Sequence, residues 1–382
     1  MQQPSSIQSY PSTEVIKNAS IKPPRTKIQS GFDLIVFSHL KWDFVYQRPQ
    51  HIISGLSDAY RILFVEEPTM QHDFTVREIK TYEATPQITV LQPKGISMAD
   101  LGVALGEFLG KQRPGTAWFY SAAFVPALCE FDFHTIIYDC MDELTLFKHA
   151  DSSLVLQEKR LLLAADIVFT GGKSLYEAKR KLHPNVYCFP SSVDARHFEK
   201  ALNGIAVPDD IKNIFGPVVG YYGVIDERID LDLIRDTASI NPEVQFVLIG
   251  PTAKISDHDL PRAENIHYLG MKSYNELPGY LKRFDIAMMP FAINDATKFI
   301  SPTKTLEYMA AGKPVISTRI EDVVKDYSEN IDLIEGAADF SEKIQHILFA
   351  GTRNMSARYA HILKKTSWSN TVKDMKTIIQ NL

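Results

Sequence analysis

The sequence lacks the phosphate-binding and metal-binding motifs that mark several large enzyme classes. No glycine-rich turn follows the first apolar run, FDLIVFSHLKWDF, where nicotinamide and flavin enzymes need close backbone approach to a pyrophosphate. Neither a Walker A sequence nor an HExxH motif occurs. These absences count against a dinucleotide oxidoreductase and leave no motif for a P-loop or zinc-peptidase reaction.

The cysteine content and the magnitude of the net charge are also low. The 382 residues include three cysteines, Cys129, Cys140 and Cys188, without metal-ligand spacing, so we expect buried free thiols in a reducing compartment. A formal net charge of −5 gives no nucleic-acid footprint. No apolar run approaches the roughly 20 residues of a membrane-spanning helix. Residues 1–30 are rich in Ser, Pro, Gln and Lys without a signal-peptide core, so we predict a disordered leader.

From Phe32 onward, short apolar runs alternate with helical stretches. Runs such as RILFVEEP and HTIIYDCMD are separated by stretches such as LVLQEKRLLLAA, which argues for a parallel sheet covered on both faces. A Gly-, Pro- and Asp-containing linker at 201–215 precedes a second alternating series. We predict an α/β protein with two Rossmann-like doubly wound domains, at 31–200 and 216–365, facing a cleft.

A helix-start pattern, SPTKTLEYMAAGKPVIST, lies between two apolar runs of the second series. We expect Ser301 to cap this helix, Pro302 to occupy its first position and Gly312 to end it. Lys304 opposes the helix dipole, but with free backbone N–H groups it would form a phosphate site. Glu307 shares its helix face and suits a sugar hydroxyl. The alternative is a Lys304–Glu307 ion pair on an ordinary surface helix.

The same string resembles the donor-binding signature of GT-B glycosyltransferases, in the large retaining, family-4-like set called group 1. The resemblance implies that Glu307 binds the donor ribose and that Ser301, Pro302, Thr303 and Lys304 bind the diphosphate. Family members usually carry a second acid eight residues before the first, and this acid helps to hold the sugar. Here Phe299 occupies that position, which leaves the sugar and the retaining or inverting outcome open.

The string GYYGVIDERIDLD opens the second domain. In the resemblance, Gly223 lies near the donor phosphates and Arg228 supplies a basic residue, although the usual Gly-Arg start is absent. Arg228 and Lys304 would clamp a diphosphate leaving group. The alternative pairs Arg228 with Asp226 or Asp232 at the surface.

Two further features follow from the resemblance. The string YLGMKSYNELPGYL is similar to a loop that holds the nucleotide base, through backbone groups near Gly270 and Met271. The last helix of the GT-B fold crosses back to the first domain, and we assign this helix to 366–382.

The loop KWDFVYQRPQHI follows the first apolar run and is expected on the acceptor side. Trp42 could stack on a sugar ring, while Gln47 and Arg48 face the cleft and the guanidinium grips a phosphate or carboxylate. The alternative is a loop anchored by buried aromatic residues, with a solvated Arg48. The string resembles bacterial transferases for cell-surface polysaccharides, including those of teichuronic-acid type.

Carboxylates end the apolar run HTIIYDCMDEL, which resembles the same bacterial set. Crowded carboxylates disfavour each other's charged forms, which makes one of them a candidate general base. We assign Asp142 this role, with Asp139 as its support. The alternative is helix capping by Asp142 and a backbone-bound Asp139. In the following loop, Gly171 and Gly172 permit close backbone approach, and a structural role is favoured.

The leading hypothesis is a cytoplasmic glycosyltransferase that uses a nucleoside-diphosphate sugar, uridine-based by preference, and a surface-glycan or lipid-linked acceptor. We expect no metal and no other cofactor, because cationic side chains replace the metal. A nucleotide-sugar epimerase and a degenerate, non-catalytic glycan-binding or assembly protein are the alternatives. The basic stretch KSLYEAKRKLH could contact anionic lipid at the inner membrane surface, although a solvated helix is the simpler interpretation.

Overall fold

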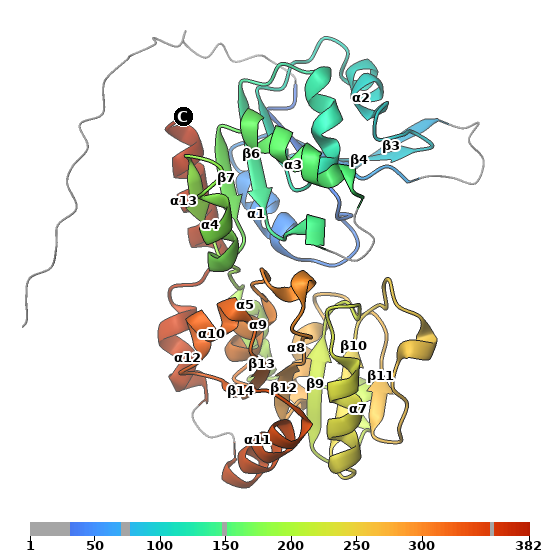
Figure 1. The fold of residues 1–382 in the computed structure, drawn as a ribbon, viewed down its shortest axis with the longest axis vertical. Helices are drawn as coiled ribbons and strands as arrows, with labels where there is room; N and C mark the ends of the chain where they lie inside the picture. Colours follow the sequence, from blue (N-terminus) through green and yellow to red (C-terminus); the bar gives the residue numbers. More distant parts are fainter. Residues whose placement is uncertain (1–30, 70–76, 147–150, 352–354) are drawn as a thin grey trace, which may run out of the picture. The chain divides into compact units, whose positions relative to one another are not determined.

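The computed structural model describes residues 31–69, 77–146, 151–351 and 355–382 (Figure 1). The leader at 1–30 lies outside these residues. The described chain forms two sheets, and the expected α/β class with a predominantly parallel sheet in each domain is confirmed.

The first sheet has the strand order β3-β4-β2-β1-β5-β6-β7-β8 and is parallel except for the β3–β4 pair. Its strands are β1 (Leu34–Ser38), β2 (Ile62–Glu66), β3 (Glu78–Thr85), β4 (Ile88–Lys94), β5 (Thr116–Phe119), β6 (Thr135–Cys140), β7 (Ile167–Thr170) and β8 (Val186–Cys188). The accompanying helices are α1 (Arg48–Leu56), α2 (Leu101–Leu109), η1 (Ala122–Cys129), η2 (Leu144–Leu146), α3 (Ser153–Ala164) and α4 (Lys173–Lys179).

Both faces of this first sheet are covered. In β1, Ile35 and Phe37 lie in one hydrophobic core, while Leu34 and Val36 lie in a second core. Side chains of a strand alternate between its two faces, so consecutive apolar residues are buried only when helices pack on both sides. The unbroken apolar run is explained by this arrangement.

The second sheet is fully parallel, with the order β11-β10-β9-β12-β13-β14. Its strands are β9 (Val218–Tyr222), β10 (Gln245–Ile249), β11 (Ile266–Tyr268), β12 (Ile286–Met289), β13 (Val315–Thr318) and β14 (Asp332–Ile334). The helices are α5 (Ala195–Phe198), η3 (Glu199–Ala201), α6 (Asp209–Lys212), α7 (Leu231–Ile240), η4 (Asp257–Asp259), α8 (Leu277–Arg283), η5 (Asp295–Thr297), α9 (Lys304–Ala310), α10 (Glu321–Tyr327), α11 (Ala337–Ala350) and α12 (Met355–Leu363).

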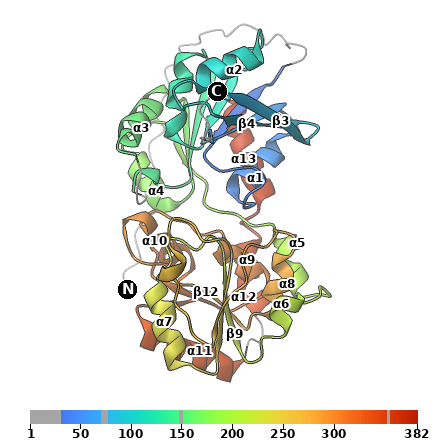
Figure 2. The ribbon, with the colours of Figure 1, turned by 90° about the vertical axis from the view of Figure 1, so that its right-hand side faces the viewer.

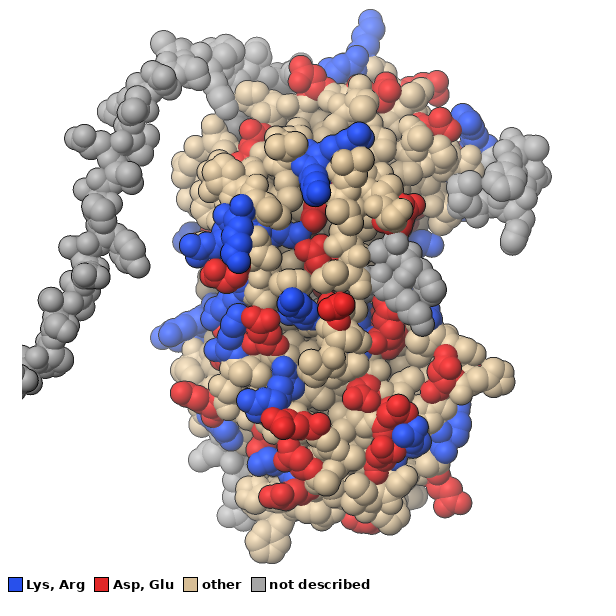
Figure 3. Space-filling model, viewed as in Figure 1, with Lys and Arg blue, Asp and Glu red and all other residues tan. Residues whose placement is uncertain are grey.

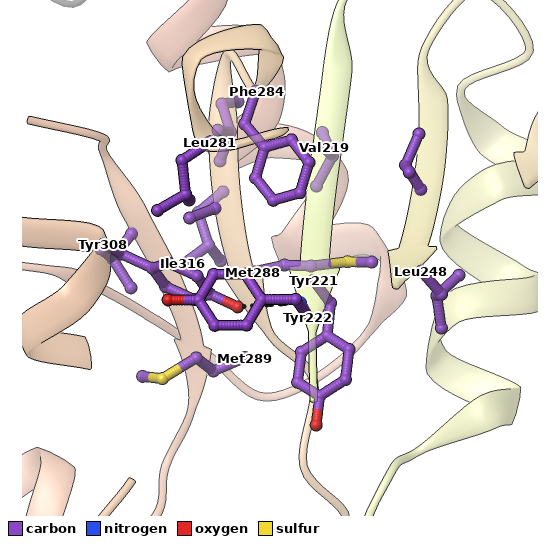
Figure 4. Close-up of a cluster of buried hydrophobic side chains, with 14 of the residues drawn as sticks. Val219, Tyr221, Tyr222, Leu248, Leu281, Phe284, Met288, Met289, Tyr308 and Ile316 are labelled. Atoms are coloured by element: carbon purple, nitrogen blue, oxygen red, sulfur yellow. Dashed lines mark hydrogen bonds between the residues drawn. The ribbon is translucent and has the colours of Figure 1, made fainter. Parts of the chain in front are cut away.

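Aromatic side chains fill the core around β9 (Figure 4). The Phe284 ring packs directly on Gly220, where an added Cβ would lie 2.2 Å from the ring. The Tyr308 hydroxyl accepts a hydrogen bond from the backbone N–H of Tyr222 at 3.2 Å. Glycine therefore allows β9 to approach its neighbours closely, and Tyr308 ties α9 to the centre of this sheet.

The chain crosses between the two sheets twice. Val193, Phe198 and Ala201 already belong to the core of the second sheet, so the first crossing precedes the predicted linker at 201–215. The second crossing leads to α13 (Trp368–Gln380), which packs against α1 (Figures 1 and 2). Its apolar face joins the core of the first sheet, and the last helix is thus part of that domain's packing.

Stacked aromatic and histidine rings lie where these crossings meet. The His51 ring stacks on Trp368 at a centroid distance of 4.8 Å, and His197 stacks on Tyr274 at 4.2 Å. Tyr46 contacts both His51 and Tyr274, at 4.6 and 4.9 Å. Residues from α1, α5, the loop before α8, and α13 are thereby joined in one cluster, which we call the hinge cluster.

The prediction of buried cysteines holds for one of the three. Cys140 is buried, Cys188 is half-buried and Cys129 is exposed. Cys129 is the last residue of η1, where the helix reaches the surface, so its apolar neighbours in the sequence did not indicate its environment.

Candidate active site

A cavity of about 110 Å³ lies between the two sheets, near the carboxyl ends of their strands. Such strand ends are where doubly wound folds bind ligands. The cavity is lined from the first domain by Val45, Gln47, Arg48, Met141, Asp142, Gly171 and Ser191, and from the second by Tyr221, Val224, Arg228, Phe291, Ile300, Ser301, Pro302, Thr303 and Lys304. Eight of the fourteen predicted site residues therefore meet at one place.

The helix that carries the predicted phosphate site begins later than expected. The N-cap of α9 is Thr303 and its first residue is Lys304, so Ser301 is not the cap and Pro302 is not the first helical residue. The Ser191 hydroxyl donates to the Ser301 carbonyl at 2.6 Å, and the Thr303 hydroxyl donates to Ser191 at 3.1 Å. This tertiary contact holds the segment before α9 as a loop. At the other end, Gly312 follows the helix with φ 66°, as expected.

Lys304 lies in the cavity wall without a hydrogen-bond or ion-pair partner among the described residues. Burial lowers the pKa of its ammonium group, and the nearby Glu307 carboxylate partly opposes this shift. A Cβ on Gly223 would lie 2.3 Å from Lys304 Cε, so Gly223 provides the space for the lysine stem. An uncompensated, partly desolvated cation is costly unless a ligand supplies the counter-charge.

Glu307 is buried behind this lysine, with 7% of its surface exposed. It accepts a hydrogen bond of 2.5 Å from the Tyr222 hydroxyl, and burial raises the pKa of its carboxyl. The alternative of a surface ion pair is wrong, since Glu307 is buried, Lys304 lies in the cavity wall, and each has a different environment. Glu307 does not line the cavity as it stands, and its role toward a ribose stays a prediction.

Arg228 is paired within the cavity wall. Its Nε and Nη2 donate to the two Asp226 oxygens at 2.9 and 2.7 Å, and Asp232 pairs instead with Arg235. The alternative was therefore right about Asp226 and wrong about the surface, because Arg228 lines the cavity and its side chain is 24% exposed. Burial opposes its charge but the pairing with Asp226 prevails, so the pKa of Arg228 is raised.

Asp142 follows β6 and lines the same cavity. Burial raises the pKa of its carboxyl, while Arg228, Arg48 and Lys304 favour the charged form. No side-chain hydrogen bond engages Asp142 within the described part of the chain, so its oxygens remain available to a ligand. Its position fits the predicted base, and the catalytic role itself stays a prediction.

Arg48 and Asp139 form a buried pair rather than separate site residues. Arg48 Nη2 lies 2.9 Å from Asp139 Oδ1, and Nη1 donates to the Phe189 carbonyl at 2.7 Å. Asp139 is fully buried, and Arg48 is 3% exposed. Arg48 is the first residue of α1, which directs it toward the sheet. Its guanidinium is thus occupied rather than solvated or free to grip an acceptor, and Asp139 supports Arg48 rather than Asp142.

Trp42 and Gln47 are placed differently. The Trp42 ring packs edge-on against Phe64 at 5.0 Å, and the backbone N–H of Trp42 donates to Glu66 Oε1 at 2.9 Å. Trp42 therefore anchors the loop, as the alternative proposed. Gln47 lines the cavity, and its N–H donates to the Gln50 side chain at 3.1 Å. Trp42 and Arg48 are held by contacts within the first domain. Gln47 is therefore the predicted acceptor residue that is best placed to contact a ligand in the cavity.

The predicted base-binding loop lies outside the cavity lining. The Gly270 carbonyl accepts from the N–H of Gly250 at 2.9 Å, and Met271 is 45% exposed. A Cβ on Gly250 would lie 1.9 Å from the Gly223 carbonyl oxygen, so these glycines bring two strand-end loops together. The role of Gly270 and Met271 toward a base stays a prediction.

Contacts between the two domains outside the cavity lining were not predicted from the sequence. The Ser174 N–H, at the start of α4, donates to Asp322 Oδ1 of α10 at 2.9 Å. Lys173 forms an ion pair with Asp326. Close approach at Gly171 and Gly172 was predicted, and a Cβ on Gly172 would lie 2.2 Å from Asp322 Oδ2. Nothing local in the sequence indicated that Asp322 was the partner.

Two absences concern only the described residues. No group of three His, Cys, Asp or Glu side chains in this part of the chain is placed to hold a metal ion. None of its helices is long and apolar enough to cross a membrane.

Residues 216–349 match the family described as glycosyl transferases group 1. The chain is 26% identical over 226 residues to a protein of Bacillus subtilis (strain 168) named "Putative teichuronic acid biosynthesis glycosyltransferase TuaH". The match spans 54% of this chain and 56% of TuaH. The match thus leaves nearly half of TuaH uncovered.

Solved structures resemble nearly the whole chain. A sucrose-phosphate synthase from Thermosynechococcus elongatus has a TM-score of 0.71 at 13% identity, covering 91% of this chain and 98% of its own. Anabaena HepE, in complex with UDP and glucose, has a TM-score of 0.63 at 12% identity, covering 92% and 100%. The expected GT-B architecture of two doubly wound domains is confirmed.

Proposed function

We propose that this chain transfers a sugar from a nucleoside diphosphate to a surface-glycan or lipid-linked acceptor. The match of residues 216–349 to the group 1 glycosyl transferases supports the proposal. UDP is the proposed nucleotide, because HepE, which shares the fold, is in complex with UDP and glucose. The observation that carries the proposal is the unpaired Lys304 ammonium beside Arg228 in a cavity between the two sheets.

Charge neutralisation of the departing diphosphate is the task of the second domain. When the bond between the sugar and the diphosphate breaks, negative charge develops on the leaving oxygen. Lys304 has no ion-pair partner among the residues that the structure describes and would take this charge as its partner, while the Asp226 pair keeps the Arg228 guanidinium oriented. Preorganised cations in a water-poor site stabilise such a transition state strongly. We propose that these two cations replace a metal ion.

Proton transfer from the acceptor is assigned to the first domain. The acceptor hydroxyl forms a bond to the sugar carbon and must lose its proton. Asp142 has free carboxylate oxygens in the cavity wall and a pKa raised by burial, as a general base requires. With Phe299 in place of the usual acid, no carboxylate of η5 or its following turn lines the cavity to hold the sugar.

Substrate entry requires the domains to separate. Ligand sites usually enclose about 300–1,000 Å³, whereas this cavity measures about 110 Å³. The Ser174–Asp322 hydrogen bond and the Lys173–Asp326 pair would break on opening. Reclosure around the donor would exclude water, whose attack is the competing hydrolysis.

The decisive test is UDP binding by Lys304→Ala, measured by calorimetry. Hydrogen bonds to charged groups contribute about 1.5–3 kcal/mol, so we expect UDP affinity to fall about tenfold to a hundredfold. Lys298→Ala is the matched control, because Lys298 is exposed and absent from the cavity lining. Equal affinity in wild type and Lys304→Ala would refute the donor site.

Turnover distinguishes transfer from the alternatives. A transferase releases UDP from a UDP-sugar in proportion to added acceptor, and Asp142→Asn should slow this release while UDP affinity is kept. UDP-sugar binding without any release would favour a degenerate binding protein. Interconversion of two UDP-sugars without acceptor would favour an epimerase.

A further inference from the structure

The first domain exposes leucines between unpaired basic side chains. Leu156 and Leu163 of α3 are 54% and 88% exposed, and Leu182, just after α4, is 63% exposed. Beside them lie the exposed side chains of Lys159, Arg160 and Lys181. We call these six residues the α3–α4 patch.

The two parts of the patch are held side by side. Lys179, buried in α4, forms ion pairs with Glu158 of α3 at 2.7 Å and with Glu143 at 2.6 Å. His183 Nε2 lies 3.0 Å from the carbonyl of Ala165, the C-cap residue of α3. Figure 2 shows α3 and α4 on the same side of the first sheet. The buried lysine and the histidine thus fix the relative position of the exposed leucines.

Helix geometry places the α3 members on one face. Residues three or four apart neighbour each other on a helix, so Leu156, Lys159, Arg160 and Leu163 form a continuous strip. Their opposite face supplies Leu161 and Leu162 to the core of the first sheet. In Figure 3, basic groups lie over α3 and α4, and both uncharged surface and acidic groups lie beside them. A strip of leucines and cations on an outer face is the composition of helices that lie in a membrane interface.

The acids near the patch in the sequence do not pair with its cations within the described part of the chain. Lys159, Arg160 and Lys181 form no ion pair there. The acids nearest in sequence have other partners: Glu158 binds Lys179, and Glu177 pairs with Arg180. The Asp166 side chain accepts from the N–H of Ile136, and Asp151 accepts from the N–H of Ser153. The patch therefore presents three cations that no ion pair within these residues neutralises, on a chain whose formal net charge is −5.

We propose that the α3–α4 patch docks the first domain on an anionic phospholipid surface. Leucines would enter the acyl boundary while the cations bind lipid headgroups. A second copy of the chain is a poorer occupant, because a symmetric contact would place like charges opposite each other. The same connection that carries Asp142 leads into α3, so docking would bring the acceptor side toward a lipid-linked acceptor. This last step rests on the proposed function; lipid binding does not.

The test is co-sedimentation of the full chain with vesicles of phosphatidylglycerol and phosphatidylcholine, against phosphatidylcholine alone. We expect binding to the anionic vesicles only, and weaker binding as salt screens the charges. Lys159→Gln with Arg160→Gln should reduce the partition coefficient about thirtyfold, at about fivefold per cation. Leu163→Ser should reduce it about tenfold through lost apolar burial.

Matched controls lie on the second domain. Phe349→Ser removes an equally exposed apolar residue, since Phe349 is 95% exposed, and Lys364→Gln with Lys365→Gln removes two exposed cations. Both should bind anionic vesicles as the wild type does. No binding of the wild type at low salt, or equal losses in the controls, would overturn the proposal. A wild-type sedimentation coefficient of a dimer that the patch variants convert to a monomer would assign the surface to self-association instead.

UDP calorimetry separates this proposal from the donor site. The patch variants should bind UDP as the wild type does, because none of the altered residues lines the cavity. Normal UDP binding with no vesicle binding refutes only the docking surface, and the reverse result refutes only the donor site.

Discussion

The two domains use charge differently at the cavity they share. In the first domain, Arg48 and Asp139 form a buried ion pair, and Nη1 of Arg48 donates to the Phe189 carbonyl. In the second, Lys304 meets no acceptor among the described residues, and Arg228 is held by Asp226 while it still lines the cavity. The paired charges of Arg48 and Asp139 stabilise the fold. The Lys304 ammonium, which has no partner among the described residues, is available to bind an anionic ligand.

The largest expected effect comes from breaking the complete pair. Asp139→Ala should lower the free energy of unfolding by about 3–5 kcal/mol, because Arg48 would stay buried without a counter-ion. Chemical denaturation gives the value. Asp226→Ala is the comparison, with an expected loss of about 1 kcal/mol, since Arg228 is partly solvated. Equal losses in the two variants would contradict the distinction between the domains.

An intermediate effect is expected where the two regions are joined, in the hinge cluster. Burial first, and then the nearby His197, lowers the pKa of His51 to about 3, whereas an unfolded histidine titrates near pH 6.5. Between these values the unfolded state binds a proton that the folded state does not. Stability is therefore full above pH 6.5 and is lost as the pH falls toward 3.

His51→Gln should make the melting temperature less dependent on pH between 7 and 5. His346→Gln, at an exposed histidine of α11, should leave the wild-type dependence intact. Thermal melts across this range measure both. Parallel curves for wild type and His51→Gln would exclude His51 as a source of acid sensitivity.

The smallest effect is expected at Lys304, which has no ion-pair partner among the described residues. Lys304→Met should raise the free energy of unfolding by about 1 kcal/mol, because residues that serve function often lower the stability of the fold. The physical reason is that a half-buried ammonium, which has no hydrogen-bond or ion-pair partner among the described residues, is replaced by an apolar side chain of similar length. The measurement is made without nucleotide, and a loss of stability comparable to that of Asp139→Ala would show that Lys304 is structural.

The local sequence pattern was sufficient to predict the strands of both sheets and the position of Lys304 at the start of a helix. Consecutive apolar residues such as those of β1 predicted strands covered on both faces, and the helix-start pattern placed Lys304 at the first turn of α9. It could not predict that Arg48 pairs with Asp139, because the two are 91 residues apart.

The same limit explains the errors at the cavity. Ser301 read as a helix cap, yet Ser191 from a distant segment holds this stretch as a loop. Trp42 read as a cleft residue, but Phe64 and Glu66 fix it inside its own domain. Tertiary partners decide which of several locally acceptable arrangements is formed.

Gly172 lies where the two domains come close together, and its lack of a side chain permits this contact. Its backbone is extended, with φ −164°, so any residue could adopt its conformation. What no other residue could share is the space, since an added Cβ would lie 2.2 Å from Asp322 Oδ2 and 3.0 Å from Ser301 Cβ. A methyl group at this position would push the two domains apart. The hydrogen atom that glycine carries there therefore permits their close approach.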